Sequence, residues 1–450
     1  MKTKSRTLDE VSRRGFERLR NEDPELFDLL QREYERQANV LCLVASSSVA
    51  DWSVLACEGM MVTNVTAEGY PGARFHAGCK VIDGIEQLAI DRANIAFKSK
   101  YANVQAHSAS TANQIVMFSV LKPGDTILGM DLNAGGHLTH GAKVSFSGQW
   151  FNAVAYGVDQ DSRIDFAQVE ELARRHRPKL IICGTTSYPR TVDFARFRAI
   201  ADEVGALLLA DITHIAGLVV SGIHASPINH AHFTTTCTHK QLYGPRGGLI
   251  LMGKDYDVVP PGATKPLHEL VQKAVFPLIQ GAPPLNGIAA KARALARAVT
   301  PEFNILMDRI VKTAREFARQ LMKRGVRVIT GGTDNHIVLV DVATHYNLTG
   351  IIAERALEDC GIIVNKNKIP GETKNVRVTS GIRIGTNTIA ARQFGPAEVQ
   401  LCVELIDKVL SSITVISESE YRLDHQMQCS VSSEVEQLCS RFPLPESQSD

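Results

Sequence analysis

A chain of 450 residues, 44% hydrophobic and 22% charged, is long enough for two or three domains around a large core. Its 49 basic residues nearly balance its 48 acidic residues. Because nucleic acid and anionic membranes attract proteins with a basic excess, neither is expected as the main partner. Nine scattered cysteines without a C-x-x-C pair fit neither a disulfide framework nor a zinc site. This usage predicts reduced thiols in a cytoplasmic protein.

The N-terminal segment, residues 1–50, is expected to be helical. Its basic start, Met1–Arg6, is followed by no signal-peptide core, and no apolar run of the chain approaches the roughly 20 residues that cross a bilayer. Pro24 opens a run of apolar residues at a 3.6-residue period, with Asp23 as the candidate N-cap. A glycine-rich stretch follows, and then a further predicted helix with apolar residues from Ile85 to Ala96.

From Tyr101 onward, short apolar runs alternate with amphipathic segments, which predicts a mostly parallel sheet covered on both faces. Asp165 and Asp193 are candidate N-caps of two of its helices. We assign residues 51–300 to this large domain. The expected strands are 102–106, 125–130, 179–183, 206–210 and 248–252, and the expected helices are 165–176 and 193–204.

After Pro301 the pattern changes to that of a smaller α+β domain over residues 301–423. The polar tail, residues 424–450, is expected to be poorly ordered. The predicted fold class is therefore α/β, with a large domain and a smaller C-terminal domain. The expected C-terminal elements are a helix at 301–324, strands at 326–330 and 336–342, a helix at 348–360, strands at 362–365 and 382–385, and a last helix at 396–412.

Lys240 follows a run of hydroxyl residues and precedes a glycine-rich turn. A loop lysine of this kind is ordinarily a surface residue. Asp211, however, ends an apolar strand, where open α/β sheets place their ligands, although it could instead cap the next helix. His214 follows three residues later.

Ser108 stands where a predicted strand gives way to a helix. Free N–H groups at such a helix N-terminus bind phosphate, although a plain N-cap shows the same pattern. His137 follows two glycines on a loop, where a histidine is usually only a surface residue. Together, a Schiff-base lysine, an acid for a ring nitrogen, a phosphate cradle and a stacking ring are what pyridoxal 5′-phosphate needs. No metal is expected.

With these motifs in place, the sequence resembles the serine hydroxymethyltransferase family from about Leu30 to Leu410. The resemblance implies fold type I of the pyridoxal-phosphate enzymes, a homodimer or homotetramer with shared active sites, and tetrahydrofolate as a cosubstrate. It rests on the runs 67–72 (AEGYPG), 86–93 (EQLAIDRA), 135–141 (GGHLTHG), 238–240 (THK), 331–336 (GGTDNH) and 379–383 (TSGIR).

The resemblance also implies roles for individual residues. Lys240 would form the Schiff base, Asp211 would hold the pyridine nitrogen, and Glu68 would be the acid/base carboxylate near the substrate hydroxyl and the folate. The implied catalytic residues are Lys240, Glu68, His137, Asp211 and His239. The implied cofactor ligands are Ser108, Ala109, Ser110, His137, Thr186, Asp211, His214, Lys240 and, from the neighbouring subunit, Gly281. Ser46, Thr66, His76 and Arg383 are implied for the substrate, and Leu132, Gly136, Leu138 and Asn365 for the folate.

Several positions depart from the family pattern. Thr66 and the pair Phe75-His76 replace three tyrosines, Ser47-Ser48 replaces Glu-Asn, and Cys237 replaces a threonine; neutral drift suffices for Leu278-Ile279. Loss of ring volume beside the substrate predicts room for a group at Cα, so we favour α-methylserine over serine. Two alternatives are a folate-independent aldolase or transaldolase for β-hydroxy-α-amino acids and a catalytically silent homologue, which the intact Lys240 disfavours.

Overall fold

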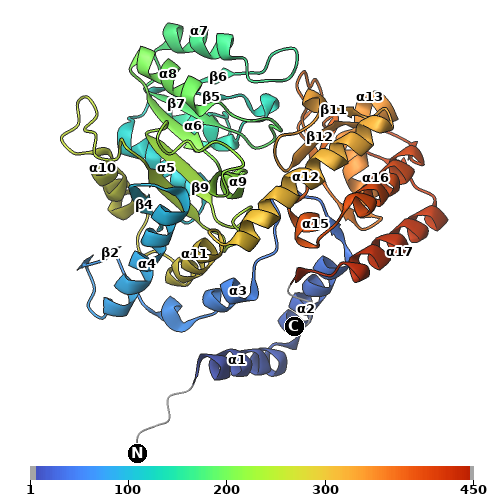
Figure 1. Ribbon diagram of the computed structural model, residues 1–450, viewed down its shortest axis with the longest axis horizontal. Coiled ribbons are helices and arrows are strands. Elements are labelled where there is room, and N and C mark those ends of the chain that lie inside the picture. Colours follow the sequence, from blue (N-terminus) through green and yellow to red (C-terminus); the bar gives the residue numbers. More distant parts are fainter. Residues whose placement is uncertain (1–6, 446–450) are drawn as a thin grey trace, which may run out of the picture.

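A seven-stranded sheet lies at the centre of the structure, a computed structural model that describes residues 7–445 (Figure 1). Its strand order is β4-β10-β9-β8-β7-β5-β6, and β10 alone is antiparallel to its neighbours. The predicted mostly parallel α/β sheet is therefore confirmed. The strands are β4 (Tyr101–Asn103), β5 (Thr126–Met130), β6 (Asn152–Tyr156), β7 (Leu180–Gly184), β8 (Leu207–Asp211), β9 (Phe233–Cys237) and β10 (Gly248–Met252).

Alternate residues of these strands face opposite sides of the sheet, as the pleat requires. Ile181 and Cys183 belong to one apolar cluster, whereas Leu180 and Ile182 belong to another. The first cluster takes residues from α4 (Lys80–Phe97), α7 (Phe166–His176), α8 (Phe194–Val204), α9 (Ala216–Val220) and α11 (Leu285–Arg297). The second takes residues from α5 (Ala109–Val120) and α10 (Leu267–Lys273). Burial on both faces explains why the central strands are continuously apolar.

A smaller, four-stranded sheet in the order β11-β12-β15-β14 has its own core. The long helix α12 (Pro301–Lys323) runs from the side of the large sheet to this second sheet (Figure 1). Leu41 and Leu43 pack into the same core, because β1 (Leu41–Cys42) pairs with β13 (Ile362–Ile363). The remaining elements here are β11 (Arg327–Val328), β12 (Ile337–Asp341), α13 (Val342–Tyr346), α14 (Gly350–Glu358), β14 (Asn365–Asn367), β15 (Gly381–Gly385), α15 (Asn387–Ala391) and α16 (Pro396–Ser411).

Two predicted strands are cut short, and the one expected at 362–365 is divided between β13 and β14, which belong to different sheets. The strand expected at 102–106 ends at Asn103, because the Val104 carbonyl accepts a hydrogen bond from Lys291 Nζ at 2.6 Å. The strand expected at 326–330 ends at Val328, where the chain enters a 3-10 turn and Thr330 takes a left-handed conformation with φ 66°. The expected N-caps Asp23, Asp165 and Asp193 all accept a backbone N–H of the helix they precede.

The prediction of a poorly ordered tail was wrong for most of its length. Residues His425–Arg441 form a helix, α17, so the helix ending at Ser411 is not the last. Val431, Val435 and Leu438 of α17 are buried at helical spacing in the core of the smaller sheet. The tail residues Glu446–Asp450 and the basic start Met1–Arg6 lie outside the described residues.

Buried Arg392 explains how α17 is attached. Its Nη1 donates to the carbonyls of Cys439 and Phe442, and its Nη2 donates to those of Gln37 and Ala38. One guanidinium therefore satisfies the C-terminal carbonyls of α17 and of α2 (Pro24–Asn39), which lie side by side (Figure 1). No helix of the described chain is long and apolar enough to span a membrane.

The other elements are short or lie at the periphery. The helix α1 (Leu8–Glu22) projects away from both sheets (Figure 1). The remaining bounds are α3 (Trp52–Glu58), η1 (Met61–Asn64), β2 (Gly69–Tyr70), β3 (Ala73–Arg74), η2 (Leu132–Ala134), η3 (Leu138–His140), α6 (Phe146–Trp150), η4 (Ala274–Ile279), η5 (Ile329–Gly331), β16 (Thr414–Val415) and β17 (Tyr421–Arg422).

Candidate active site

Lys240 lies on a tight turn just beyond the end of β9. Thr238 Oγ1 donates to the Pro245 carbonyl at 2.6 Å, which closes the turn. Lys240 Nζ lies 2.7 Å from His214 Nε2, and burial lowers the pKa of both groups. The His214 ring stacks on His336 with 5.7 Å between ring centroids. Burial disfavours the charged form of Lys240, whereas the nearby Asp211 and Cys237 act in the opposite direction, and the net effect is a lowered pKa.

Asp211 is the buried anion of the site, at the carboxyl end of β8. Its Oδ2 accepts hydrogen bonds from Asn113 Nδ2 at 2.8 Å and from His140 Nε2 at 3.1 Å, and its Oδ1 accepts the Thr213 N–H at 3.0 Å. Although burial acts to raise the pKa of Asp211, the hydrogen bonds from His140 and Thr213 hold it below its usual range. The carboxylate is therefore ionised at neutral pH.

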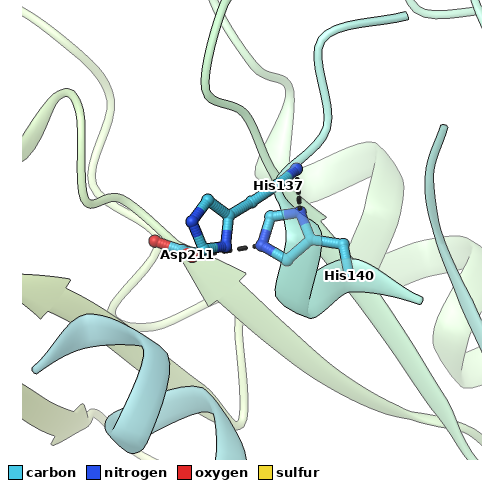
Figure 2. A group of neighbouring side chains, drawn as sticks. All are labelled: His137, His140 and Asp211. Carbon is cyan, nitrogen blue, oxygen red and sulfur yellow. Dashed lines mark hydrogen bonds and ion pairs between the residues drawn. The ribbon is translucent and has the colours of Figure 1, made fainter. Parts of the chain in front are cut away.

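His137, His140 and Asp211 form one cluster (Figure 2). One possible metal-ligand atom of each residue, a ring nitrogen or a carboxylate oxygen, lies within 4.8 Å of the other two. The His137 N–H donates to His140 Nδ1 at 3.3 Å, so His140 carries its proton on Nε2, which donates to Asp211. Because both nitrogens of His140 are engaged, the cluster is a hydrogen-bond network rather than an open set of metal ligands. Burial lowers the pKa of His137 to about 4, so this ring is neutral.

The proposed phosphate cradle lies at the N-terminus of the 12-residue helix α5. Ser108 caps this helix by accepting the Thr111 N–H at 3.0 Å. Among the described residues, no hydrogen-bond partner is found for the N–H groups of Ala109 and Ser110. Unpaired N–H groups at a helix N-terminus bind phosphate. A side chain at Gly248 would come within 2.3 Å of the Ser108 carbonyl, so only glycine lets β10 approach here.

Buried Arg383 lies in the middle of β15, in the smaller sheet. Its Nε donates to Asn365 Oδ1 at 3.0 Å and its Nη1 donates to the Thr186 carbonyl at 2.8 Å. Burial lowers the pKa of Arg383 to about 10, which still leaves it charged. The Thr186 N–H donates to the Gly135 carbonyl at 2.7 Å. Thr186 is therefore hydrogen-bonded both to Arg383 and to the loop before His137.

Ser46 and His239 line a cleft of about 650 Å3. The two segments are joined because Ser48 Oγ donates to the His239 carbonyl at 2.6 Å. Burial lowers the pKa of His239 to about 4. Of the residues expected at the folate, Leu132 and Leu138 are exposed, whereas Gly136 is packed so closely on the Met130 carbonyl that no side chain fits.

The structure does not bring every expected residue to Lys240. The small β2–β3 hairpin lies at the edge of the molecule (Figure 1). Glu68 directly precedes β2 in the sequence, and its Oε2 lies 3.3 Å from Nε2 of His76, just after β3. Gly281 belongs to this group, since a Cβ placed on it would lie 3.5 Å from Glu68 Oε1. Thr66 is exposed. Within residues 7–445, no hydrogen bond, ion pair or ring contact joins these four residues to the Lys240 centre.

Two contributors to the centre carried no expected role. His140 lies inside the run 135–141 that supports the family resemblance, but only the tertiary contact with Asp211 shows its function. His336 lies in another such run, and its Nε2 lies 3.1 Å from the Ala45 carbonyl. A sequence signal existed at both positions, since histidines are common at functional sites.

The residues present fit pyridoxal phosphate. Lys240, anionic Asp211 and the free N–H groups of α5 match its aldehyde, ring nitrogen and phosphate, and His214 Nδ1 is buried without a partner among the described residues. A lysine and an acid at the carboxyl ends of neighbouring parallel strands, beside a helix N-terminus, define an enzyme of the α/β class that binds a phosphorylated aldehyde cofactor.

Comparison with known proteins identifies the family. A family profile described as serine hydroxymethyltransferase matches residues 19–406. A serine hydroxymethyltransferase from Paramagnetospirillum magneticum is 47% identical over 427 residues, which cover 95% of this chain and 96% of that relative. The chain belongs to the serine hydroxymethyltransferase family, and it is a pyridoxal-phosphate-dependent hydroxymethyltransferase of fold type I. Enzymes of this family use tetrahydrofolate as their cosubstrate.

Proposed function

We propose that the protein cleaves the Cα–Cβ bond of serine or of a Cα-substituted serine and transfers the one-carbon unit to tetrahydrofolate. The product is glycine from serine and alanine from α-methylserine. The observation that carries the proposal is the Lys240 amine beside His214, with the anionic Asp211 at the end of the neighbouring strand. Pyridoxal phosphate, when bound, supplies the electron sink for the carbanion that the cleavage leaves.

The other roles in the reaction are assigned to residues of the chain itself. Lys240 Nζ provides an amine whose pKa burial lowers, and His214 Nε2 is placed at 2.7 Å to accept its hydrogen bond. Asp211 would offer its negative charge to the protonated ring nitrogen of the cofactor. The hydrogen bond from His140 keeps the Asp211 carboxylate in position. Arg383 would bind the substrate carboxylate, because a guanidinium matches that group in a bidentate fashion and two of its nitrogens are already fixed.

Glu68 is proposed as the acid/base group for the substrate hydroxyl, working in the active site of a second subunit. What supports this is that Glu68, His76 and Gly281 form a group of their own, without contact to Lys240 in the described chain. We therefore propose a homodimer or homotetramer with shared active sites. Mixing Lys240→Ala chains with Glu68→Gln chains should then restore about a quarter of wild-type activity, through mixed dimers with one intact site; no recovery would contradict the shared site.

The substrate of choice is proposed to be α-methylserine. What supports it is the absence of a ring at Thr66, an exposed residue two positions before Glu68. Cleavage needs no α-hydrogen, so a methyl group at Cα is chemically acceptable. Rates with L-serine and with D- and L-α-methylserine, each with and without tetrahydrofolate, test this choice. If L-serine with folate is faster than every α-methyl substrate, the preference is overturned.

Thr66→Tyr is the matched variant for this choice. A phenol at position 66 should reduce α-methylserine turnover more than serine turnover, because in the shared site it would fill the space beside Cα of a substrate bound at Lys240 of the second subunit. Equal losses for both substrates would show that position 66 does not select between them. Activity on β-phenylserine without folate would favour the alternative, a folate-independent aldolase. Phe75 supports this alternative, because it replaces a tyrosine that contacts folate in the family.

The division of the chain is part of the same proposal. Residues 51–300 would form the cofactor-binding domain and residues 301–423 the smaller domain, with Arg383 and Asn365 contributed from the latter. The hydrogen bond from Arg383 to the Thr186 carbonyl supports an active site between the two. A cytoplasmic location remains a prediction.

A further inference from the structure

Behind the turn that carries Lys240 there is a second pocket, with a volume of about 390 Å3. Three arginines line it. Arg293 and Arg297 lie four residues apart on α11, and Arg309 comes from α12. Residues four apart on a helix share one face, so the two α11 guanidinium groups lie on the same side of the helix.

Among the described residues, one of these three arginines has a carboxylate within ion-pair distance. Arg297 Nη1 lies 3.1 Å from Asp51 Oδ2. Arg293 Nε donates to Ser53 Oγ at 2.6 Å, and Ser53 Oγ in turn donates to the carboxylate of Asp51, so Asp51 also faces Arg293. Arg309 Nη1 donates to the Ala390 carbonyl at 3.1 Å. Glu302 also lines the pocket, but in the described part of the chain no carboxylate lies within ion-pair distance of Arg293 or Arg309. The pocket therefore keeps an excess of positive charge.

The rest of the lining is largely apolar, with Leu242, Phe303 and Leu306 among it. Guanidinium groups bind carboxylates and phosphates in a bidentate fashion, and a cavity of a few hundred Å3 encloses a small organic molecule. We infer that this pocket is a binding site for a small organic anion, a carboxylate or phosphate ester with a short apolar body. Such a site is separate from the proposed serine and folate sites.

The pocket shares a wall with the active site. Tyr243 lines it, and the Tyr243 N–H donates to the Lys240 carbonyl at 3.0 Å. Tyr243 also has a left-handed backbone, with φ 53°, and its hydroxyl donates to the Asn387 carbonyl at 2.8 Å. A ligand in the pocket would thus rest against the back of the Lys240 turn.

The carboxylate chemistry has two sources. One is a free anion. The other is the chain itself, because Pro445 lines the pocket and the acidic residues Glu446 and Asp450 follow it in the sequence. A chain ending at Pro445 separates the two sources, since it lacks both acidic side chains.

The test is calorimetric titration of the holoenzyme with glutarate at constant ionic strength. Glutarate should bind the full chain, or should bind only the chain ending at Pro445 if the acidic residues already fill the pocket. Arg293→Met and Arg309→Met should each weaken binding about tenfold or more, because each removes a charged hydrogen-bond donor. Arg309→Lys keeps the positive charge but loses the bidentate guanidinium, so its glutarate affinity should lie between those of the wild type and Arg309→Met.

Arg315→Met is the matched control, since Arg315 is an exposed residue of the same helix α12 that does not line the pocket. It should change glutarate affinity less than twofold, on the order of a surface substitution. The inference is overturned if neither chain binds glutarate. It is equally overturned if binding survives the double change Arg293→Met and Arg309→Met, because the anion would then occupy another site such as Arg383.

Discussion

The two halves of the proposed active site are built in opposite ways. At the Lys240 centre, Asp211 has a side chain only 5% exposed and three hydrogen bonds from protein groups. In the hairpin region, the Glu68 side chain is 35% exposed and its contact is with His76, which is more exposed still. The first half is organised before any ligand arrives, whereas the second is open on one side. The Lys240 centre is therefore preorganised within a single chain, whereas the region around Glu68 is left partly open.

Lys240→Ala should give the largest loss, because it removes the amine on which the buried half depends. We expect activity to fall by about 10^4-fold or more and the cofactor absorbance band of the purified protein to disappear. Absorption spectroscopy and steady-state rates check this. Lys254→Ala, an exposed lysine, is the control and should keep both. A colourless wild-type protein would contradict the cofactor assignment.

Glu68→Gln tests the open half. Activity should fall by about 100-fold or more, because the acid/base carboxylate is lost. The free energy of unfolding should change by less than about 0.5 kcal/mol, because in the described part of the single chain the Glu68 side chain is 35% exposed and His76 is its one side-chain partner. Rates and urea unfolding measure the two effects, with the exposed Glu171→Gln as control. A large loss of stability would show that the two halves are not built differently.

The buried half should be sensitive to acid. Burial lowers the pKa of His336 to about 3, against an unfolded value near 6.5. Between these values the unfolded chain binds more protons, so the free energy of unfolding falls as pH decreases from 6.5, by about 1 kcal/mol per pH unit. Urea unfolding at pH 7, 6 and 5 should show a smaller slope for His336→Gln. An unchanged slope would contradict the buried neutral imidazole.

His140→Gln should give the smallest of these effects. His140 would be a positioning residue, acting on the cofactor through Asp211, so activity should fall about tenfold. The change should also move the pH dependence of the cofactor absorbance, because Asp211 loses a donor to Oδ2. A merely structural role would lower stability and leave that pH dependence unmoved. Spectra recorded across pH separate the two cases.

Short-range sequence patterns correctly predicted features that depend on neighbouring residues, such as helix starts, N-caps and strand ends. The helix beginning at Pro301, the N-caps Asp165 and Asp193, and Asp211 at a strand end were all visible in the order of residues. The tail was misjudged because its composition is polar overall. Its buried residues, Val431, Val435 and Leu438, are few and matter only because another surface is present to cover them.

The family resemblance supplied the candidate residues, but not their neighbours. The contact of His140 with Asp211 spans 71 residues, and that of Ala45 with His336 spans 291. No period or spacing encodes such a pair, since it depends on the path of the whole chain. Nor could the sequence predict that Glu68 has no contact with the Lys240 centre in the described chain.

By itself, the sequence indicated the α/β class and the candidate cofactor lysine and acid, and it showed the absence of phenols at Thr66, Phe75 and His76. These follow from residue identity and from short-range periodicity, which fix hydrogen bonding and burial within one element. Only the tertiary structure decided that Asp211 is ionised, that Glu68 stands apart, and that three arginines surround a pocket behind the Lys240 turn. Burial, charge and ion pairing are properties of the assembled chain, because each depends on groups that meet only when distant segments pack.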